Sequence, residues 1–258
     1  MPFADLSDVR IHYSLTGAEA APVLVFSNSL GANFSMWDPQ LDLSKKFRIL
    51  RYDTRGHGQS TSPPGPYTIE LLAHDVLHLL DALGFDRVFF CGLSMGGQTG
   101  IWLGLHAPNR LHKLILCNTG AKIGTADGWN TRIETVLNKG MAEVSRAVAS
   151  RWFTPPFQSV HPEVFAHAVE MIESANPQGY SACCAALREF DARQELSAIK
   201  THTLIIAGSH DAATPPADGR FIADKIPGAC FHELQAAHLS NIEASSEFTL
   251  EVQKFLSA

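Results

Sequence analysis

The chain of 258 residues is long enough for one large α/β domain and too short for two domains with separate cores. Its 45% hydrophobic and 18% charged residues are typical of a folded globular protein and exclude a disordered or highly charged scaffold. The net charge of −6, without any run of Lys or Arg, provides no basic surface, so we exclude nucleic acid as a partner.

The amino terminus and the cysteines indicate a cytoplasmic protein. The chain starts Met1-Pro2-Phe3-Ala4-Asp5, with an acid where a signal peptide would carry Lys or Arg before a long apolar run. No stretch approaches the roughly 18 uninterrupted apolar residues of a membrane span, so we expect no membrane contact. The five cysteines are odd in number, and Cys183 and Cys184 are adjacent, which argues against a disulfide framework.

Short β-rich runs recur along the chain, and the central ones are almost entirely apolar, as expected for strands covered on both faces. In chain order they are Val9–Tyr13, Val23–Phe26, Arg48–Tyr52, Val88–Cys91, Lys113–Cys117, Thr203–Ala207 and Cys230–Leu234. Helical patterns lie between them, and the clearest runs from Ile69 to Leu83, opened by Thr68 as N-cap and closed by Gly84. This alternation predicts an α/β fold with a mostly parallel sheet and helices on both faces.

The alternation of strands and helices breaks once, between Thr125 and Phe190. This stretch contains only helical patterns, which are interrupted by glycine and proline. We therefore expect one α/β core domain, made of residues 1–124 and 191–258. Residues 125–190 are expected to be inserted as a helical cap over the end of the sheet.

A nucleophile motif follows one of the apolar strands. The segment Gly92-Leu93-Ser94-Met95-Gly96 lies between this strand and a helical pattern, which is the context of a G-x-S-x-G nucleophile elbow. The glycines are needed because the serine backbone is strained and neighbouring backbone comes close. The turn would lift the Ser94 hydroxyl clear at the carboxyl end of the sheet, beside a helix N-terminus. We predict Ser94 as the nucleophile, with an idle serine in a glycine-rich turn as the alternative.

A serine nucleophile needs a base and an orienting acid, which this fold supplies in the chain order Ser, Asp or Glu, His. Asp211 follows the strand Thr203–Ala207, and His238 follows the strand Cys230–Leu234. The two residues would lie on neighbouring loops, because the chain between them has room for one helix and one strand. The predicted catalytic triad is Ser94, Asp211 and His238.

Other residues compete for these roles. Asp53 is a rival acid, but it follows an early strand and precedes a glycine turn. His57, in that turn, is expected to be structural, and His210 would compete with Asp211 for one loop position. The loop after Lys113–Cys117 offers no carboxylate, which favours Asp211 as the acid.

One pair of histidines has the spacing of a zinc pair. His74 and His78 are separated by four residues on a predicted helix. They lie off its apolar stripe and have neither a Glu between them nor an obvious third ligand, so we expect no metal site.

Acyl transfer also needs donors for the developing oxyanion. One is the backbone N–H of Met95, which follows the nucleophile at the start of its helix. The second should come from the loop after Val23–Phe26, which reads Ser27-Asn28-Ser29-Leu30-Gly31. From its position in this loop, we predict that the Leu30 N–H is the second donor. Gly31 would allow the backbone to come close to the substrate oxygen. A plain tight loop is the alternative.

These residues resemble those of a known family. The whole chain looks like an α/β-hydrolase, and more narrowly it resembles the 3-oxoadipate enol-lactonases of aromatic catabolism. The elbow and triad are shared by many hydrolases, whereas the loop at Asn28 and the stretch at Lys122 are similar to the lactonase form. The segments that carry the resemblance are Asn28-Ser29-Leu30-Gly31, Trp37, Tyr52-Asp53-Thr54-Arg55-Gly56-His57-Gly58, Gly92-Leu93-Ser94-Met95-Gly96-Gly97, Asn118-Thr119, Lys122-Ile123-Gly124-Thr125 and Ala237-His238-Leu239-Ser240-Asn241.

The resemblance implies a reaction in the β-ketoadipate pathway. An unsaturated five-membered lactone with a carboxymethyl arm would be hydrolysed to 3-oxoadipate through an acyl-enzyme on Ser94. The partner implied is this small anionic lactone, and no metal or organic cofactor is required. A carboxylesterase, a carbon–carbon bond hydrolase or a perhydrolase would use the same triad, and a ligand receptor on this fold also stays open. The sequence leaves the oligomeric state undecided.

An anionic substrate calls for a local cation, because the protein itself carries a charge of −6. Most cations of the expected cap should be solvated. Arg188 differs, because it follows an apolar run where the chain returns to the sheet, and we predict that it clamps the substrate carboxylate. Trp129 and Trp152 are predicted to form an aromatic wall of the same site, with core packing as the alternative. The cap cations are Arg132, Lys139, Arg146, Arg151 and Arg188.

Overall fold

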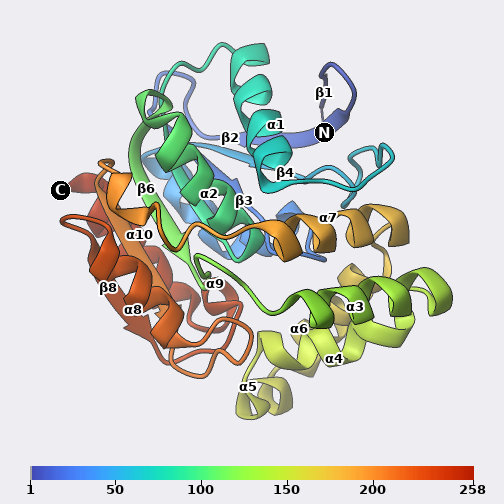
Figure 1. Ribbon diagram of the computed structural model, residues 1–258. Helices are drawn as coiled ribbons and strands as arrows, with labels where there is room; N and C mark the ends of the chain where they lie inside the picture. The colour runs from blue at the N-terminus through green and yellow to red at the C-terminus, as the bar shows by residue number, and fades with distance from the viewer. Residues whose placement is uncertain (1) are drawn as a thin grey trace.

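A single eight-stranded sheet runs through the computed structural model, which describes residues 2–258 (Figure 1). The strand order is β1-β2-β4-β3-β5-β6-β7-β8. The pairs β1–β2 and β2–β4 are antiparallel, and all the other neighbours are parallel. The strands are β1 (Phe3–Asp5), β2 (Arg10–Thr16), β3 (Val23–Ser27), β4 (Arg48–Tyr52), β5 (Val88–Leu93), β6 (Leu111–Cys117), β7 (Thr203–Gly208) and β8 (Cys230–Leu234).

The predicted α/β fold with a mostly parallel sheet is confirmed, and the seven predicted strands correspond to β2–β8. The sequence did not predict β1, which is too short to show a hydrophobic alternation. Strand β2 continues to Thr16 rather than ending at Tyr13, because its last residues pair with β4. In both places strand pairing, which is a tertiary contact, decides where the strand lies.

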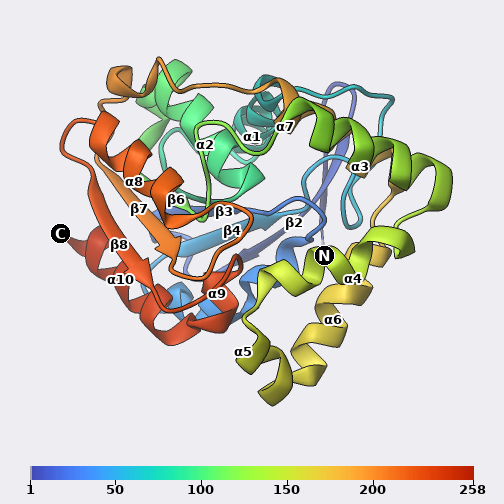
Figure 2. The ribbon, with the colours of Figure 1, turned by 60° about the horizontal axis from the view of Figure 1, so that its bottom comes forward.

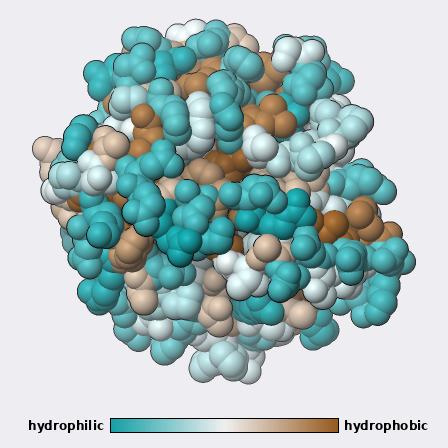
Figure 3. Space-filling view, viewed as in Figure 1, coloured by the Kyte–Doolittle hydropathy of each residue, from teal (hydrophilic) through white to brown (hydrophobic). Residues whose placement is uncertain are grey.

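The central strands are apolar throughout because helices cover both faces of the sheet (Figure 2). Val25 of β3 packs in one cluster with residues of α1, α2 and α8, whereas its neighbours Leu24 and Phe26 pack with residues of η1 and α10. Hydrophilic side chains cover most of the face in Figure 3, and hydrophobic ones gather near its centre. The covering helices are η1 (Phe34–Lys45), α1 (Ile69–Ala82), α2 (Met95–His106), α8 (Pro216–Lys225) and α10 (Ser245–Ser257).

Helix α1 has the ends that its sequence predicts. The Thr68 hydroxyl accepts a hydrogen bond from the Leu71 N–H at 3.1 Å and so caps the first turn. Gly84 follows the last turn with a φ of 73°, a left-handed conformation that glycine adopts without strain.

Five α-helices between β6 and β7 form what we call the α3–α7 block. In Figures 1 and 2, α3–α6 lie together at one side of the molecule, beyond the edge of the helices that cover the sheet. None of the helices within residues 2–258 combines the length and apolar character that a membrane crossing requires. The helices of the block are α3 (Ala126–Lys139), α4 (Ala142–Trp152), α5 (Pro155–Val160), α6 (Pro162–Glu173) and α7 (Pro177–Glu189). Two short 3-10 helices, η2 (Pro108–Arg110) and η3 (Leu196–Ala198), and the four-residue helix α9 (Ser240–Glu243) complete the fold.

Helix α7 rests directly on the turn after β4. A Cβ atom on Gly179 would lie 2.4 Å from the Cα of Gly56, which is closer than atoms of two residues can approach. Gly56 also has a φ of 78°. Two glycines therefore allow backbone-to-backbone contact between the α3–α7 block and the sheet domain.

Asp53, at the end of β4, belongs to a buried structural network. Its carboxylate lies 2.7 Å from the His12 ring and accepts hydrogen bonds from the N–H groups of Phe34 and Gln59 at 2.8 and 2.9 Å. Its oxygens are thus occupied in holding the start of η1 and the turn after β4.

Arg55 is buried in the same turn, with only 1% of its side chain exposed. Its guanidinium donates two hydrogen bonds to Asp75 of α1, at 2.5 and 2.6 Å, and two to Asp8 at 3.0 Å. A buried charge requires such pairing, because an unpaired one would be strongly destabilising. The pairing fixes the turn against α1 and against the amino-terminal strands.

His57 holds the loop after β3 from the same turn. Its Nε2 accepts a hydrogen bond from the Gly31 N–H at 2.9 Å, which places the ring proton on Nδ1. Burial lowers the pKa of His57 to about 4, so the ring is neutral at physiological pH. A protonated ring would lose the acceptor that Gly31 needs.

We expect acid to destabilise the protein partly through His57. Between the ordinary histidine pKa of 6.5 and the folded value of about 4, the unfolded chain binds a proton at this residue and the folded chain does not. Stability should therefore fall as the pH decreases through this window, by on the order of 3 kcal/mol from this residue.

Urea unfolding at about pH 7 and about pH 4.5 measures this effect. His57→Gln keeps an acceptor but does not titrate, so its unfolding free energy should change less between the two pH values. The exposed His210→Gln serves as the control and should behave like the unmodified protein. Identical pH dependence in His57→Gln and the unmodified chain would contradict the assignment.

Candidate active site

Ser94 occupies a sharp turn between β5 and α2. Its backbone has φ 59° and ψ −113°, which side-chain-bearing residues rarely adopt. A Cβ atom on Gly92 would lie 2.0 Å from the carbonyl oxygen of Gly96, and one on Gly96 would lie 2.3 Å from that of Ser27. Only glycine fits at these two positions, which is the physical reason for the G-x-S-x-G pattern.

Asp211 and His238 meet across two neighbouring loops, after β7 and β8. The Nδ1 of His238 donates a hydrogen bond of 2.8 Å to Oδ2 of Asp211, which leaves Nε2 as the free acceptor. Both side chains are almost fully buried, with 3% and 0% exposed. This hydrogen bond orients the imidazole with Nε2 free to accept a proton, which is the arrangement that a general base requires.

The surroundings of Asp211 favour its charged form. Burial alone would raise its pKa, but the charge of His238 and hydrogen bonds from His238, Thr214 and Asn118 lower it to about 2. The Thr214 hydroxyl donates to Asp211 at 2.7 Å and the Asn118 amide at 3.0 Å. The carboxylate is therefore ionised wherever His238 can work as a base.

Asn118 connects the two loops, a role that sequence reasoning missed. It follows β6 with a φ of 43°, and its amide also donates to the Ala237 carbonyl at 3.1 Å. Its side-chain oxygen accepts a hydrogen bond from the Ser240 hydroxyl at 2.6 Å. The signal in the sequence was an Asn directly after a buried strand, a residue type that tolerates this backbone conformation.

Ser94 and His238 line one narrow cavity of about 80 Å³. Within residues 2–258 the Ser94 hydroxyl and the His238 ring are not hydrogen-bonded, as is common before substrate binds. Both still face the same space, so a small ligand in it would contact the two together. The cavity is lined by Ser29, Leu30, Ser94, Ile123, Trp129, Arg132, Val148, Arg151, Trp152, Tyr180, Leu187, Ala213, Thr214 and His238.

The backbone amides of Leu30 and Met95 are the two predicted oxyanion donors. In the loop after β3, the N–H groups of Ser29 and Gly31 have acceptors, whereas within residues 2–258 none lies against that of Leu30. Met95 is the first residue of α2, where an N–H has no partner in its own helix. The two predicted oxyanion donors are thus the amides left available, and Leu30 lines the cavity itself.

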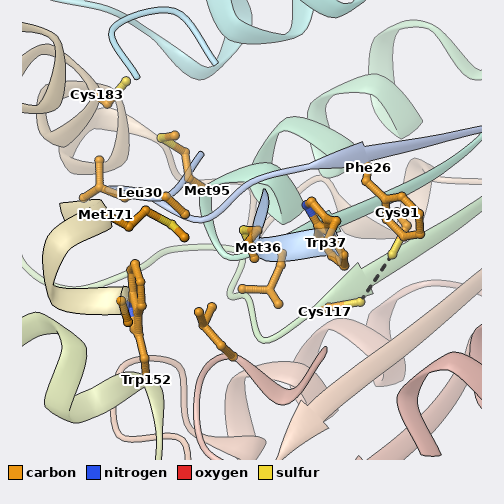
Figure 4. Packing of buried hydrophobic residues seen from close by; sticks show 14 of the residues in the cluster. Phe26, Leu30, Met36, Trp37, Cys91, Met95, Cys117, Trp152, Met171 and Cys183 are labelled. Atoms are coloured by element: carbon orange, nitrogen blue, oxygen red, sulfur yellow. Dashed lines mark hydrogen bonds between the residues drawn. The ribbon is translucent and has the colours of Figure 1, made fainter. Parts of the chain in front are cut away.

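Trp129 and Trp152 both line the cavity. Both also pack against the buried apolar cluster, which was the alternative to a role in the site. Trp152 of α4 is 2% exposed, and Trp129 of α3 donates its ring N–H to the Ile123 carbonyl at 2.7 Å. Figure 4 shows Trp152 in one apolar cluster with Met171 of α6 and with Leu30.

The expected position of Arg188 is wrong. Its guanidinium donates to Asn130 at 2.6 Å and to the adjacent Glu189 at 2.7 Å, and it is not among the residues around the cavity. The preceding residue of α7, Leu187, lines the cavity instead. Because consecutive residues of a helix point about 100° apart, Arg188 faces the outer side of the block.

Arg132 of α3 takes the position that sequence reasoning gave to Arg188. It lines the cavity, and its guanidinium donates to the hydroxyl of the buried Tyr180 at 3.0 Å. Arg132 was expected to be one of the solvated cations of this region. The overlooked signal was its spacing, because Trp129 and Arg132 are three residues apart and so share one face of a helix.

Glu243 ties the loop after β8 to the α3–α7 block. Its carboxylate accepts hydrogen bonds from the N–H groups of Ala237, at 2.8 Å, and Thr154, at 3.1 Å. A further backbone bond of 2.9 Å joins the Leu239 N–H to the Trp152 carbonyl. The wall that carries Trp152 and the loop that carries His238 are therefore fixed to each other.

The two histidines of α1 lie next to each other on the helix. The ring centroids of His74 and His78 are 6.1 Å apart, and His74 lies against Trp102 at 5.0 Å. Within residues 2–258, no three or more His, Cys, Asp or Glu side chains are grouped as a metal ion would require.

Comparison with known proteins places the chain among hydrolases. Residues 22–151 match the family model described as the alpha/beta hydrolase fold. The chain is 42% identical to 3-oxoadipate enol-lactonase 2 of Acinetobacter baylyi, over 95% of this chain and 92% of the relative. Identity to 3-oxoadipate enol-lactonase 1 of the same organism is 41%, over 91% of this chain and 88% of the relative.

A solved structure agrees with this placement. The crystal structure of the enol-lactonase from Burkholderia xenovorans LB400 matches with a TM-score of 0.98 and 45% identity, over 100% of both chains. The elbow, the sheet order and these similarities lead to one conclusion: the chain belongs to the α/β-hydrolase family.

Proposed function

We propose that this protein hydrolyses 3-oxoadipate enol-lactone to 3-oxoadipate, within aromatic catabolism. The observation that carries the proposal is a Ser94, Asp211 and His238 arrangement on a small cavity, in a chain 42% identical to an enol-lactonase over almost its whole length. The five cysteines within residues 2–258 are free thiols, which supports the further proposal of a cytoplasmic location.

In the acylation step, Ser94 Oγ attacks the lactone carbonyl while His238 Nε2 accepts the hydroxyl proton. The negative charge on the carbonyl oxygen is stabilised by the N–H groups of Leu30 and Met95. Collapse of this tetrahedral intermediate breaks the bond to the ring oxygen. The ring opens as an enol, which takes the proton from His238 and tautomerises to the ketone.

In the deacylation step, one water molecule attacks the ester formed on Ser94. His238 accepts the proton of this water and returns it to Ser94 Oγ as the ester bond breaks. The products are the free enzyme and 3-oxoadipate, and the net change is the addition of one water to the lactone. Ionised Asp211 stabilises the imidazolium in both steps.

The α3–α7 block would select the substrate. We propose that residues 125–190 act as a cap on a core of residues 1–124 and 191–258, with Trp129 and Trp152 as the wall against the lactone ring. Arg132 is the proposed partner of the substrate carboxylate, because it lines the cavity and Tyr180 holds its guanidinium in place.

A substrate panel tests the proposed reaction. We expect kcat/KM for the enol-lactone to exceed that for p-nitrophenyl esters and for dienoate ketones by orders of magnitude. Ser94→Ala should abolish turnover of every substrate, because all depend on the same nucleophile. A preference for simple esters would instead identify a carboxylesterase, and single-turnover behaviour with an intact triad would indicate a receptor.

We expect Asp211→Asn to lower kcat by about 10⁴, because the His238 ring loses its orienting charge. Steady-state kinetics measure the loss, and a thermal unfolding curve shows whether the fold is intact. Asp53→Asn is the matched control, since Asp53 is also a buried carboxylate beside a histidine. If Asp53→Asn lost kcat in this way in a folded protein and Asp211→Asn did not, the assigned acid would be wrong.

Arg132→Ala should raise KM for the anionic lactone by about a hundredfold, because it removes a charge-assisted contact to the carboxylate. Neutral esters of similar size should keep their KM. Arg188→Ala, which removes an outward-facing cation of the same block, is the control and should change neither value. Equal losses for charged and neutral substrates in Arg132→Ala would mean that Arg132 only supports the cavity wall.

A further inference from the structure

A second and wider hollow lies beside the catalytic cavity, and we call it the outer pocket. Its volume is about 430 Å³. The end of α4, the start of α5 and the loops after β7 and β8 form its walls, which include Arg151, His210 and Gln235. The same two loops carry Asp211 and His238, so the outer pocket lies immediately behind the proposed triad.

Arg151 is common to both hollows. It lines the catalytic cavity together with Arg132, and it also lines the outer pocket. A side chain that lines both hollows lies at the boundary between them. A ligand that moves from one to the other passes this guanidinium.

The guanidinium of Arg151 differs in its surroundings from those of Arg132 and Arg188. Within residues 2–258 no acceptor or carboxylate binds it, whereas Arg132 is bound to Tyr180 and Arg188 to Asn130. Arg146, on the same helix, packs over a ring of α6. Arg151 is thus a cation on the cavity wall whose donors are free for a ligand.

The two carboxylates on the segments beside the outer pocket bind groups other than Arg151. Asp211 points into its own network with His238 and Thr214. The carboxylate of Glu243 is engaged by backbone N–H groups on both sides of the outer pocket. Arg151 therefore keeps its charge and its donors available on this wall, although the whole chain carries −6.

The chemistry of the site creates an anion where Arg151 lies. This step rests on the proposed function, because hydrolysis of the lactone turns a monoanion into a dianion. One carboxylate is present throughout and would be held by Arg132. The second is released from Ser94 when water cleaves the acyl-enzyme, and it needs a cation on the way to solvent.

We propose that Arg151 and the outer pocket form a second anion site, which binds the newly formed carboxylate of a small dicarboxylate product. Arg132 and Arg151 hold the two ends of the product while it is in the catalytic cavity. The outer pocket is then its route to solvent. The site is therefore selective for dicarboxylates over monocarboxylates of equal chain length.

Direct binding to the Ser94→Ala protein tests this site without any turnover. The probes are adipate, a stable six-carbon dicarboxylate, and hexanoate, the matched monocarboxylate, each measured by isothermal titration calorimetry. Adding Arg151→Ala should weaken adipate binding about tenfold, the loss of one exposed charge-assisted contact, and should leave hexanoate within about twofold. Adding Arg132→Ala should weaken both ligands.

Arg146→Ala, also in the Ser94→Ala background, is the control for general charge and should change neither affinity. Unchanged adipate binding in the Arg151 variant would overturn the proposal, and so would equal losses for adipate and hexanoate. Turnover of the enol-lactone by the unmodified chain reports on the proposed function separately. If that turnover were absent while Arg151→Ala still weakened the binding of adipate and not of hexanoate, the anion site would be supported and the assigned substrate would be wrong.

Discussion

The backbone of Ser94 has a strained conformation, which destabilises the fold by on the order of 1–3 kcal/mol. The site depends on surrounding contacts that offset this strain. Close contact between the elbow and the neighbouring strand makes the conformation possible, because Gly92 and Gly96 leave no Cβ atoms in the way. The same contact brings the Met95 amide to the start of α2, next to the serine. The positions of the proposed nucleophile and of one proposed oxyanion donor thus depend on one local constraint.

Charge is handled differently at the two buried aspartates beside histidines. Asp53 faces His12 and accepts hydrogen bonds from two backbone amides, so this pair holds a turn in place. Asp211 is satisfied by Thr214 and Asn118 in much the same way, but its histidine has the second ring nitrogen on the cavity side. The two pairs therefore differ chemically in the surroundings of the histidine ring nitrogen that is not bound to the aspartate.

The cavity is built from two parts of the chain, and their connections explain why it is small. Helix α7 touches the turn after β4 through paired glycines, and Glu243 joins the start of α5 to the loop after β8. These contacts bring Trp152 and Arg132 over the elbow at a short distance. A block attached more loosely would leave the same residues too far away to select a small ligand.

By itself the sequence determined the strands of the sheet, the glycine-flanked turn at Ser94 and the placement of Asp211 and His238 on neighbouring loops. Strand patterns, glycine requirements and loop positions are local or depend on chain order. It did not determine which arginines line the cavity. Arg132 and Arg188 both belong to the α3–α7 block, and only the packing of α3 and α7 decided that Arg132 lines the cavity and Arg188 does not. Asn118 and Glu243 were missed for a related reason. Their roles consist of hydrogen bonds between segments far apart in the chain, and such contacts exist only once the tertiary structure has formed.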